Sequence, residues 1–219
     1  TGGPPPGGPP AGVPGPPGAG KSTWTLSLGA NLAHYHGLKG ALLQFEDNPE
    51  RNRKELIRYR MGIMGGGSGP ARDEAITWID KMFRTVAPSE TVDDETDFDL
   101  PWLREAIEEA AGRHGCRWIV IDPWNQLEHN IPAGKTETQY ISESLSAVTE
   151  FVRGIWAEKL HGGNVHVWIV AHPKIMMKEK NGNYPIPRPY DVAGGAHWWN
   201  KADNCITVWR DQGEGTPEV

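Results

Sequence analysis

The chain has 219 residues, enough for one α/β domain with a substantial core and too few for two large domains. Its formal net charge of −6 excludes a protein that attracts nucleic acid with its whole surface, so any such contact must come from local loops. No apolar run approaches the roughly 18 residues of a membrane span, and Cys116 and Cys205 lack metal-ligand spacing, so we expect a soluble protein with buried thiols in a reducing cytosol.

Glycine and proline dominate residues 1–13, a composition that buries little apolar surface and supports neither a regular helix nor a regular strand. We therefore expect an irregular leader over residues 1–13 and an ordered core over residues 14–219, truncated at both ends.

The rest of the chain alternates between helix and strand patterns. Gly37 marks the end of the first helix, and Asn48 followed by Pro49 marks the start of the second. In chain order, we predict helices over residues 21–36, 50–61, 73–81, 100–114 and around 141–155, and strands over residues 41–45, 82–86, 118–121, 165–171 and 205–209. Because the strands alternate with helices, these elements favour an α/β fold with a mostly parallel, twisted sheet and helices on both faces.

A glycine-rich motif lies where the first helix begins. Residues 15–22 fit the pattern G-x-x-x-x-G-K-[ST], in which backbone N–H groups encircle phosphate oxygens at a helix N-terminus. Lys21 would neutralise the β- and γ-phosphates of a nucleotide, and Ser22 would ligate magnesium. The predicted nucleotide-binding residues are Gly15, Pro17, Gly18, Ala19, Gly20, Lys21, Ser22 and Thr23. The alternative is that a leader rich in proline and glycine matches this pattern by composition.

The segment before this motif departs from the usual arrangement, in which a buried apolar strand precedes the loop. Residues 9–14 contain three prolines, and proline cannot occupy a central position in a strand ladder. We therefore expect the first strand to be missing or altered, or to be replaced by a segment elsewhere.

Two acidic residues follow predicted buried strands. Asp122 ends the strand over residues 118–121, a position that can hold the magnesium ion of a bound nucleotide, although an aspartate there can also cap a helix or form a turn. Glu46 follows the strand over residues 41–45 and would point into the crevice at the carboxyl ends of the strands. It is a candidate general base for an attacking water, and the alternative is an exposed loop acid.

In their order along the chain, these motifs resemble the DnaB/Twinkle branch of RecA-like hexameric helicases, including phage primase-helicases. The resemblance extends from Gly15 to Arg210. It implies a RecA-like P-loop NTPase that uses ATP and Mg2+, with Glu46 as the catalytic glutamate and Asp122 as the metal-binding acid. It also implies that His172, which by itself would be an ordinary histidine at a strand end, senses the γ-phosphate.

The resemblance further implies contacts outside the nucleotide site. The loop over residues 173–191 corresponds to a loop that the family projects into the central channel of its ring, and its predicted DNA-binding cations are Lys174, Lys178, Lys180 and Arg188. A solvated basic loop is the alternative. Arg210 falls where these helicases place an arginine finger that completes the ATP site of the neighbouring subunit, so a ring, usually a hexamer, is expected. The alternative for Arg210 is a surface arginine.

Two hypotheses from different classes follow. The first is an ATP-dependent DNA helicase motor, which hydrolyses ATP at the subunit interfaces of a homo-oligomeric ring and translocates on single-stranded DNA. Its expected location is the cytoplasm of a bacterium or of a phage-infected host, near the nucleoid. The second is a RecA/KaiC-type regulatory or DNA-binding ATPase, or a degenerate scaffold, without unwinding activity. A small-molecule P-loop kinase is less favoured, because the 173–191 loop looks more like a nucleic-acid contact than a lid.

Overall fold

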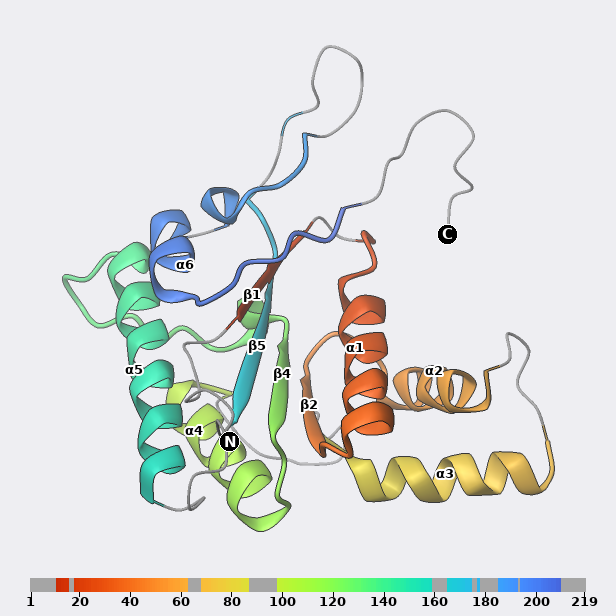
Figure 1. Ribbon diagram of the computed structural model, residues 1–219. Helices are drawn as coiled ribbons and strands as arrows, with labels where there is room; N and C mark the ends of the chain where they lie inside the picture. The colour runs from red at the N-terminus through yellow and green to blue at the C-terminus, as the bar shows by residue number, and fades with distance from the viewer. Residues whose placement is uncertain are drawn as a thin grey trace, which may run out of the picture.

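The computed structural model describes residues 11–15, 18–62, 68–86, 98–158, 165–174, 177, 185–192 and 194–209. Within these residues a five-stranded sheet forms the centre of the molecule (Figure 1). Its strands are β1 (Ala11–Pro14), β2 (Gly40–Gln44), β3 (Phe83–Val86), β4 (Trp118–Asp122) and β5 (His166–Ala171). The strand order is β1-β5-β4-β2-β3 and every neighbouring pair is parallel, which confirms the predicted parallel sheet.

The helices follow the predicted alternation. They are α1 (Lys21–His36), α2 (Pro49–Met61), α3 (Pro70–Met82), α4 (Leu100–Glu108), α5 (Glu137–Glu158) and α6 (Gly195–Lys201). A π-helical turn, η1 (Glu109–Arg113), continues α4, and the 3-10 turns are η2 (Trp124–Gln126) and η3 (Pro189–Asp191). The side chain of Asn48 accepts a hydrogen bond from the backbone N–H of Glu50, so the predicted cap of α2 is present. The helix α6 and the turn η3 were not predicted.

Two apolar cores cover the two faces of the sheet. Side chains alternate along a strand, so Leu42 faces one core and Leu43 faces the other. The core around Leu42 includes buried residues of α1, α2 and α3, whereas the core around Leu43 includes buried residues of α4, α5 and α6. Figure 1 shows the same division, with α1 to α3 on one side of the strands and α4 to α6 on the other. The predicted helices on both faces are confirmed.

The prediction of an irregular leader is wrong for the residues that form β1. Val13 pairs with Val170 of β5, and β1 lies directly before the glycine-rich loop, so the prediction that the first strand is missing or replaced is also wrong. Proline is tolerated at the end of β1 because the carbonyl of Pro14 faces away from β5 and accepts a hydrogen bond from the N–H of Val208 at 3.0 Å. In a parallel ladder the N–H and the carbonyl of one residue face the same neighbour. The donor that Pro14 lacks is therefore also on the side away from β5, at the end of the strand.

The segment over residues 204–208 lies along the outer edge of β1. Its backbone exchanges hydrogen bonds with Gly12, whose N–H donates to the carbonyl of Asn204 and whose carbonyl accepts from Ile206, each at 2.9 Å. The segment forms a single parallel bridge, between Gly12 and Cys205, rather than the full strand predicted over residues 205–209. It therefore protects the edge of β1 without extending the regular sheet.

Candidate nucleotide-binding site

The glycine-rich loop joins β1 to α1 and leaves the first turn of α1 open to an anion. Gly18 and Gly20 have φ angles of 73° and 94°, a left-handed backbone that favours glycine. Gly20 is the N-cap of α1 and no side chain caps this helix, so its first N–H groups remain available to phosphate oxygens. Pro17 lies outside the described residues, Ala19 is half-buried and Thr23 is exposed.

Lys21 is buried at the start of α1, with 6% of its surface exposed. Its Nζ atom donates a hydrogen bond to the carbonyl of Gly15 at 2.9 Å. Burial lowers the pKa of Lys21, and the negative charges of Asp122, Glu46 and Asp47 oppose this shift. The lysine therefore lies within the electrostatic reach of three carboxylates that follow or end neighbouring strands.

The two predicted magnesium ligands are in contact. Asp122 is the last residue of β4, is 7% exposed, and accepts a hydrogen bond from the hydroxyl of Ser22. Burial raises the pKa of Asp122 to about 6; the hydrogen bond from Ser22 and the charge of Lys21 oppose this shift, whereas the charge of Asp47 adds to it. A cation between these oxygens would remove the cost of burying the carboxylate.

Glu46 and His172 meet at the same end of the sheet. The Oε2 atom of Glu46 lies 3.4 Å from Nε2 of His172, and Oε1 accepts a hydrogen bond from Nε2 of Gln126 at 3.1 Å. The backbone N–H of His172 donates to Oδ1 of Asn125 at 2.8 Å. Burial lowers the pKa of His172, the charge of Lys21 lowers it further, and Glu46 opposes the shift. The structure thus brings together Lys21, Ser22, Glu46, Asp122 and His172.

Of the predicted DNA-binding cations, Lys174 and Arg188 lie close together. Both are exposed, and both donate a backbone hydrogen bond to Asp191: Lys174 to its carbonyl at 2.7 Å and Arg188 to its Oδ2 atom at 2.6 Å. Lys178, Lys180 and Arg210 lie outside the described residues.

Three residues near the site were missed as functional candidates. Asp47 acts electrostatically on both Lys21 and Asp122, and Gln126 orients Glu46. Gln44 is paired in register with Asp122, is 3% exposed, and has an Oε1 atom with no hydrogen-bond partner in the structure. A polar residue ending an otherwise apolar strand, as in the sequence Ala-Leu-Leu-Gln, was the available signal for Gln44.

These residues fit a hydrated magnesium ion beside a triphosphate. The hydroxyl of Ser22 and the carboxylate of Asp122 are hard oxygen ligands, and the unpartnered Oε1 atom of Gln44, on the adjacent strand, can accept from a metal-bound water. In the part of the chain that the structure describes, no group of three or more His, Cys, Asp or Glu side chains could hold a metal ion by itself. Magnesium suits such a site, since it keeps several waters and shares its ligands with phosphates.

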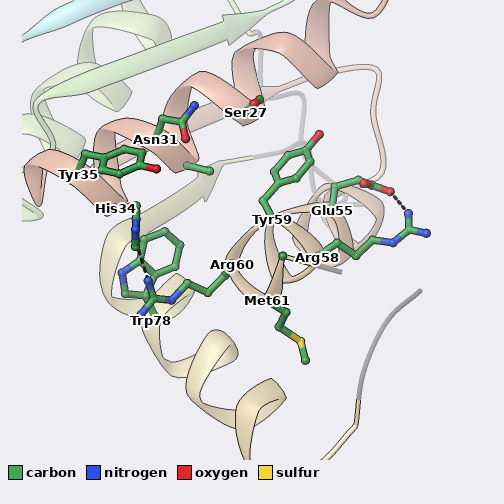
Figure 2. Close-up of a pocket in the computed structure, with 12 residues that line it drawn as sticks. Ser27, Asn31, His34, Tyr35, Glu55, Arg58, Tyr59, Arg60, Met61 and Trp78 are labelled. Atoms are coloured by element: carbon green, nitrogen blue, oxygen red, sulfur yellow. Dashed lines mark hydrogen bonds and ion pairs between the residues drawn. The ribbon is translucent and has the colours of Figure 1, made fainter. Parts of the chain in front are cut away.

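A separate hollow of about 700 Å³ lies between α1, α2 and α3 (Figure 2). It is lined by the later turns of α1, including Asn31 and Tyr35, rather than by the first turn that carries Lys21. At one end Arg60 lies over the Trp78 ring at 4.7 Å and forms a 2.9 Å hydrogen bond with His34. None of the predicted site residues lines this hollow.

Among the described residues, no helix is both long enough and apolar enough to cross a lipid bilayer.

The chain resembles known proteins in its sequence and in its fold. No protein-family model matches the chain. The chain is 32% identical over 212 residues to the Twinkle homolog protein, chloroplastic/mitochondrial, of Arabidopsis thaliana. The alignment covers 92% of this chain and 28% of that protein. This chain therefore spans less than a third of the length of that curated relative.

Solved structures share the fold. The ATPase domain of G40P superimposes with a TM-score of 0.67 at 16% identity, covering 96% of this chain and 72% of that one. A DnaB-like replicative helicase, described with its interactions with primase, superimposes with a TM-score of 0.70 at 16% identity, covering 96% of this chain and 49% of that one. These comparisons confirm the RecA-like α/β fold and the resemblance to ATPase domains of the DnaB/Twinkle type.

Proposed function

We propose, from this resemblance to DnaB/Twinkle-type ATPase domains, that the chain is the motor core of a DNA helicase that hydrolyses ATP in a ring. The observation that carries the proposal is the convergence of Lys21, Asp122, Glu46 and His172 at one end of a parallel sheet, directly beside a glycine-rich loop. Ligands bind at this end of open α/β sheets, where the strands expose their carboxyl ends.

ATP binding follows from the charge arrangement of the loop. The open N–H groups at the start of α1 and the ammonium group of Lys21 would hold the β- and γ-phosphates. Ser22 and Asp122 would hold magnesium, which when bound neutralises charge that develops on the phosphate oxygens. A triphosphate would also give Lys21 a second set of negative partners and so offset its burial.

Hydrolysis would use Glu46 as the base. Its carboxylate accepts a proton from the attacking water, whose oxygen bonds to the γ-phosphorus while the bond to the β–γ bridging oxygen breaks and ADP leaves. Gln126 and His172 hold the two carboxylate oxygens, so both fix the direction of the base. Burial and the charge of Lys21 lower the pKa of His172, which favours its neutral ring; the tautomer with its proton on Nε2 would donate that proton either to Glu46 or to the γ-phosphate.

The partners of this motor would be single-stranded DNA and further copies of the chain. Lys174 and Arg188, with Lys178 and Lys180, would contact the phosphate backbone. Arg210 would reach the ATP site of a neighbouring subunit, most simply in a hexameric ring. The names of the solved relatives describe an ATPase domain and a replicative helicase that interacts with primase, which supports a role in replication.

ATP hydrolysis measured with and without single-stranded DNA tests the proposal. We expect DNA to stimulate turnover and Lys21→Ala and Glu46→Gln each to abolish it, with nucleotide binding lost in the first variant and retained in the second. Hydrolysis that DNA does not change, or no turnover in the unaltered chain, would contradict a motor.

The role of Arg210 is tested by mixing two inactive variants. A ring that contains both Glu46→Gln and Arg210→Ala subunits regains complete sites, because an Arg210→Ala subunit receives the arginine of its neighbour. We expect the mixture to recover hydrolysis and light scattering to detect assembly with ATP, magnesium and single-stranded DNA. A chain that stays monomeric under all these conditions would rule out a finger in trans.

The alternative, a regulatory ATPase or degenerate scaffold, would gain support from an absent first strand, because nucleotide binding would then be weakened. The strand β1 removes that support. We also propose a location in the cytoplasm of a bacterium or of a phage-infected host, although the name of the Arabidopsis relative assigns that protein to chloroplasts and mitochondria.

A further inference from the structure

Tyr190 and Trp199 form a stacked aromatic pair on the surface. Their ring centroids are 5.8 Å apart with an angle of 28° between the ring planes, and the side chains are 54% and 53% exposed. Tyr190 comes from η3 and Trp199 from α6. The neighbouring Trp198 is buried and packs edge-on against Trp124 at 5.9 Å, so it anchors α6 while Trp199 lies on the outer side. Neither of the two apolar cores depends on Tyr190 or Trp199 for its packing.

Two cationic residues lie next to this pair along the backbone. Arg188 precedes Tyr190 by two residues, and the backbone of Lys174 is hydrogen-bonded to Asp191, the residue after Tyr190. Both cationic side chains are exposed. The acid of the same turn, Asp191, is occupied by the backbone N–H of Arg188, so its carboxylate fixes the turn. Exposed aromatic faces with adjoining cations match the two chemical parts of a single-stranded nucleic acid, its bases and its phosphates.

We propose that Tyr190 and Trp199 are a stacking platform for a base of single-stranded nucleic acid. This inference rests on the proposed function. It adds a contact with the bases, whereas the cations of the loop would contact only phosphates. Stacking on aromatic rings accepts any base, because every base has a π face, so the platform serves a motor that moves along many sequences.

A short backbone path joins the platform to the nucleotide site. The strand β5 ends at Ala171, His172 follows, and the next residue, Pro173, forms an antiparallel bridge with Val192. Val192 is two residues from Tyr190, and His172 lies against Glu46. The helix α6 also lies at the end of the sheet where α1 begins (Figure 1). A base on the platform and a phosphate at His172 therefore act on the same hydrogen-bonded segment.

The platform predicts that the bases themselves contribute to affinity. The experiment measures binding of the full chain, with magnesium and a non-hydrolysable ATP analogue, to a labelled thymidine oligonucleotide and to an abasic oligonucleotide of equal length and charge. We expect the unaltered chain to prefer the thymidine oligonucleotide by about 5- to 100-fold. Trp199→Ala and Tyr190→Ala should bring this ratio close to one without changing the salt dependence, which reports phosphate contacts.

Two control variants separate stacking from other effects. Trp199→Phe keeps an aromatic face and should keep most of the preference. Tyr35→Ala removes an aromatic residue that is 73% exposed on α1 and should leave the preference unchanged. Thermal unfolding of each variant checks that the fold is intact.

The outcomes distinguish this inference from the proposed function. If DNA stimulates hydrolysis but the base preference is absent or survives both alanine variants, the platform is wrong and the motor stands. If neither oligonucleotide binds, both fail. If Trp199→Ala changes the size of the assembly by light scattering and leaves the base preference intact, the pair is a contact between copies of the chain, which overturns the proposal.

Discussion

The carboxylate of Glu46 and the imidazole of His172 meet across the central strand β4, with 3.4 Å between Oε2 and Nε2. The two residues follow β2 and β5, which are not neighbours in the sheet. This contact therefore links the ends of two strands that do not touch each other.

Replacing His172 should reduce turnover more than nucleotide binding. We expect His172→Ala to lower the rate of ATP hydrolysis by up to about 100-fold, because Glu46 loses one of the two groups that aim it. The affinity for ATP, measured by calorimetry, should change little. The control is His36→Ala, an exposed histidine at the end of α1. Equal losses of rate in the two variants would refute an orienting role for His172.

The ionisation of Asp122 should lower the free energy of unfolding as the pH rises. Burial raises its pKa in the folded protein to about 6 from the ordinary value of 3.8, so the folded form binds this proton more tightly than the unfolded form. The stabilisation by protonation is complete below pH 3.8 and is lost as the pH rises to about 6. We therefore expect Asp122→Asn to raise the free energy of unfolding by up to about 3 kcal/mol at pH 7 and hardly at all at pH 3.5.

Urea unfolding at these two pH values measures the effect of Asp122→Asn. Glu150→Gln, an exposed acid-to-amide change on α5, is the matched control and should shift neither curve. A stabilisation by Asp122→Asn of the same size at both pH values would exclude the carboxyl proton as its cause. The same variant should lose magnesium-dependent ATP binding, since an amide supplies no charge to the metal.

Gly20→Ala should weaken nucleotide binding because Gly20 has a left-handed backbone with a φ of 94°. A residue with a Cβ atom is strained there by roughly 1–2 kcal/mol, and relief of the strain rotates the N–H groups that face the phosphates. We expect a loss of ATP affinity of at least about tenfold. Gly37→Ala, at the left-handed end of α1, carries a comparable strain at a φ of 64° and should leave ATP affinity unchanged. Titration of a fluorescent ATP analogue compares the two, and an equal loss in both would contradict this explanation.

Gly40→Ala should unfold the protein more easily. A Cβ atom at Gly40 would lie 1.9 Å from Cε2 of Trp118, whose buried ring is held by a hydrogen bond from Nε1 to the carbonyl of Leu38. We expect a cost of about 3 kcal/mol or more, measured by urea unfolding. Gly154→Ala is the control, because a Cβ atom there meets nothing within 4 Å on an exposed helix face, and it should stabilise α5 by up to about 1 kcal/mol. Similar costs for both changes would show that the Trp118 contact is unimportant.

Local sequence patterns determined most of the elements and the starting point of the site. Residues 118–121 could be predicted as a buried strand because they are apolar throughout, and the cap at Asn48 acts within its own turn. The glycine-rich loop could be recognised for the same reason, since its function depends on the backbone freedom of neighbouring residues. The helix α6 escaped prediction because it spans only Gly195–Lys201, too short for a clear apolar period.

Only the tertiary structure decided how these parts combine. Pro14 is compatible with β1 because it ends the strand and its carbonyl faces away from β5, toward the 204–208 segment, which lies far along the chain. The pKa of Asp122, the contact of Glu46 with His172 and the unpartnered oxygen of Gln44 depend on side chains from several strands. Periodicity is a local property of a sequence, whereas burial and electrostatic interaction are sums over neighbours that only the folded chain brings together.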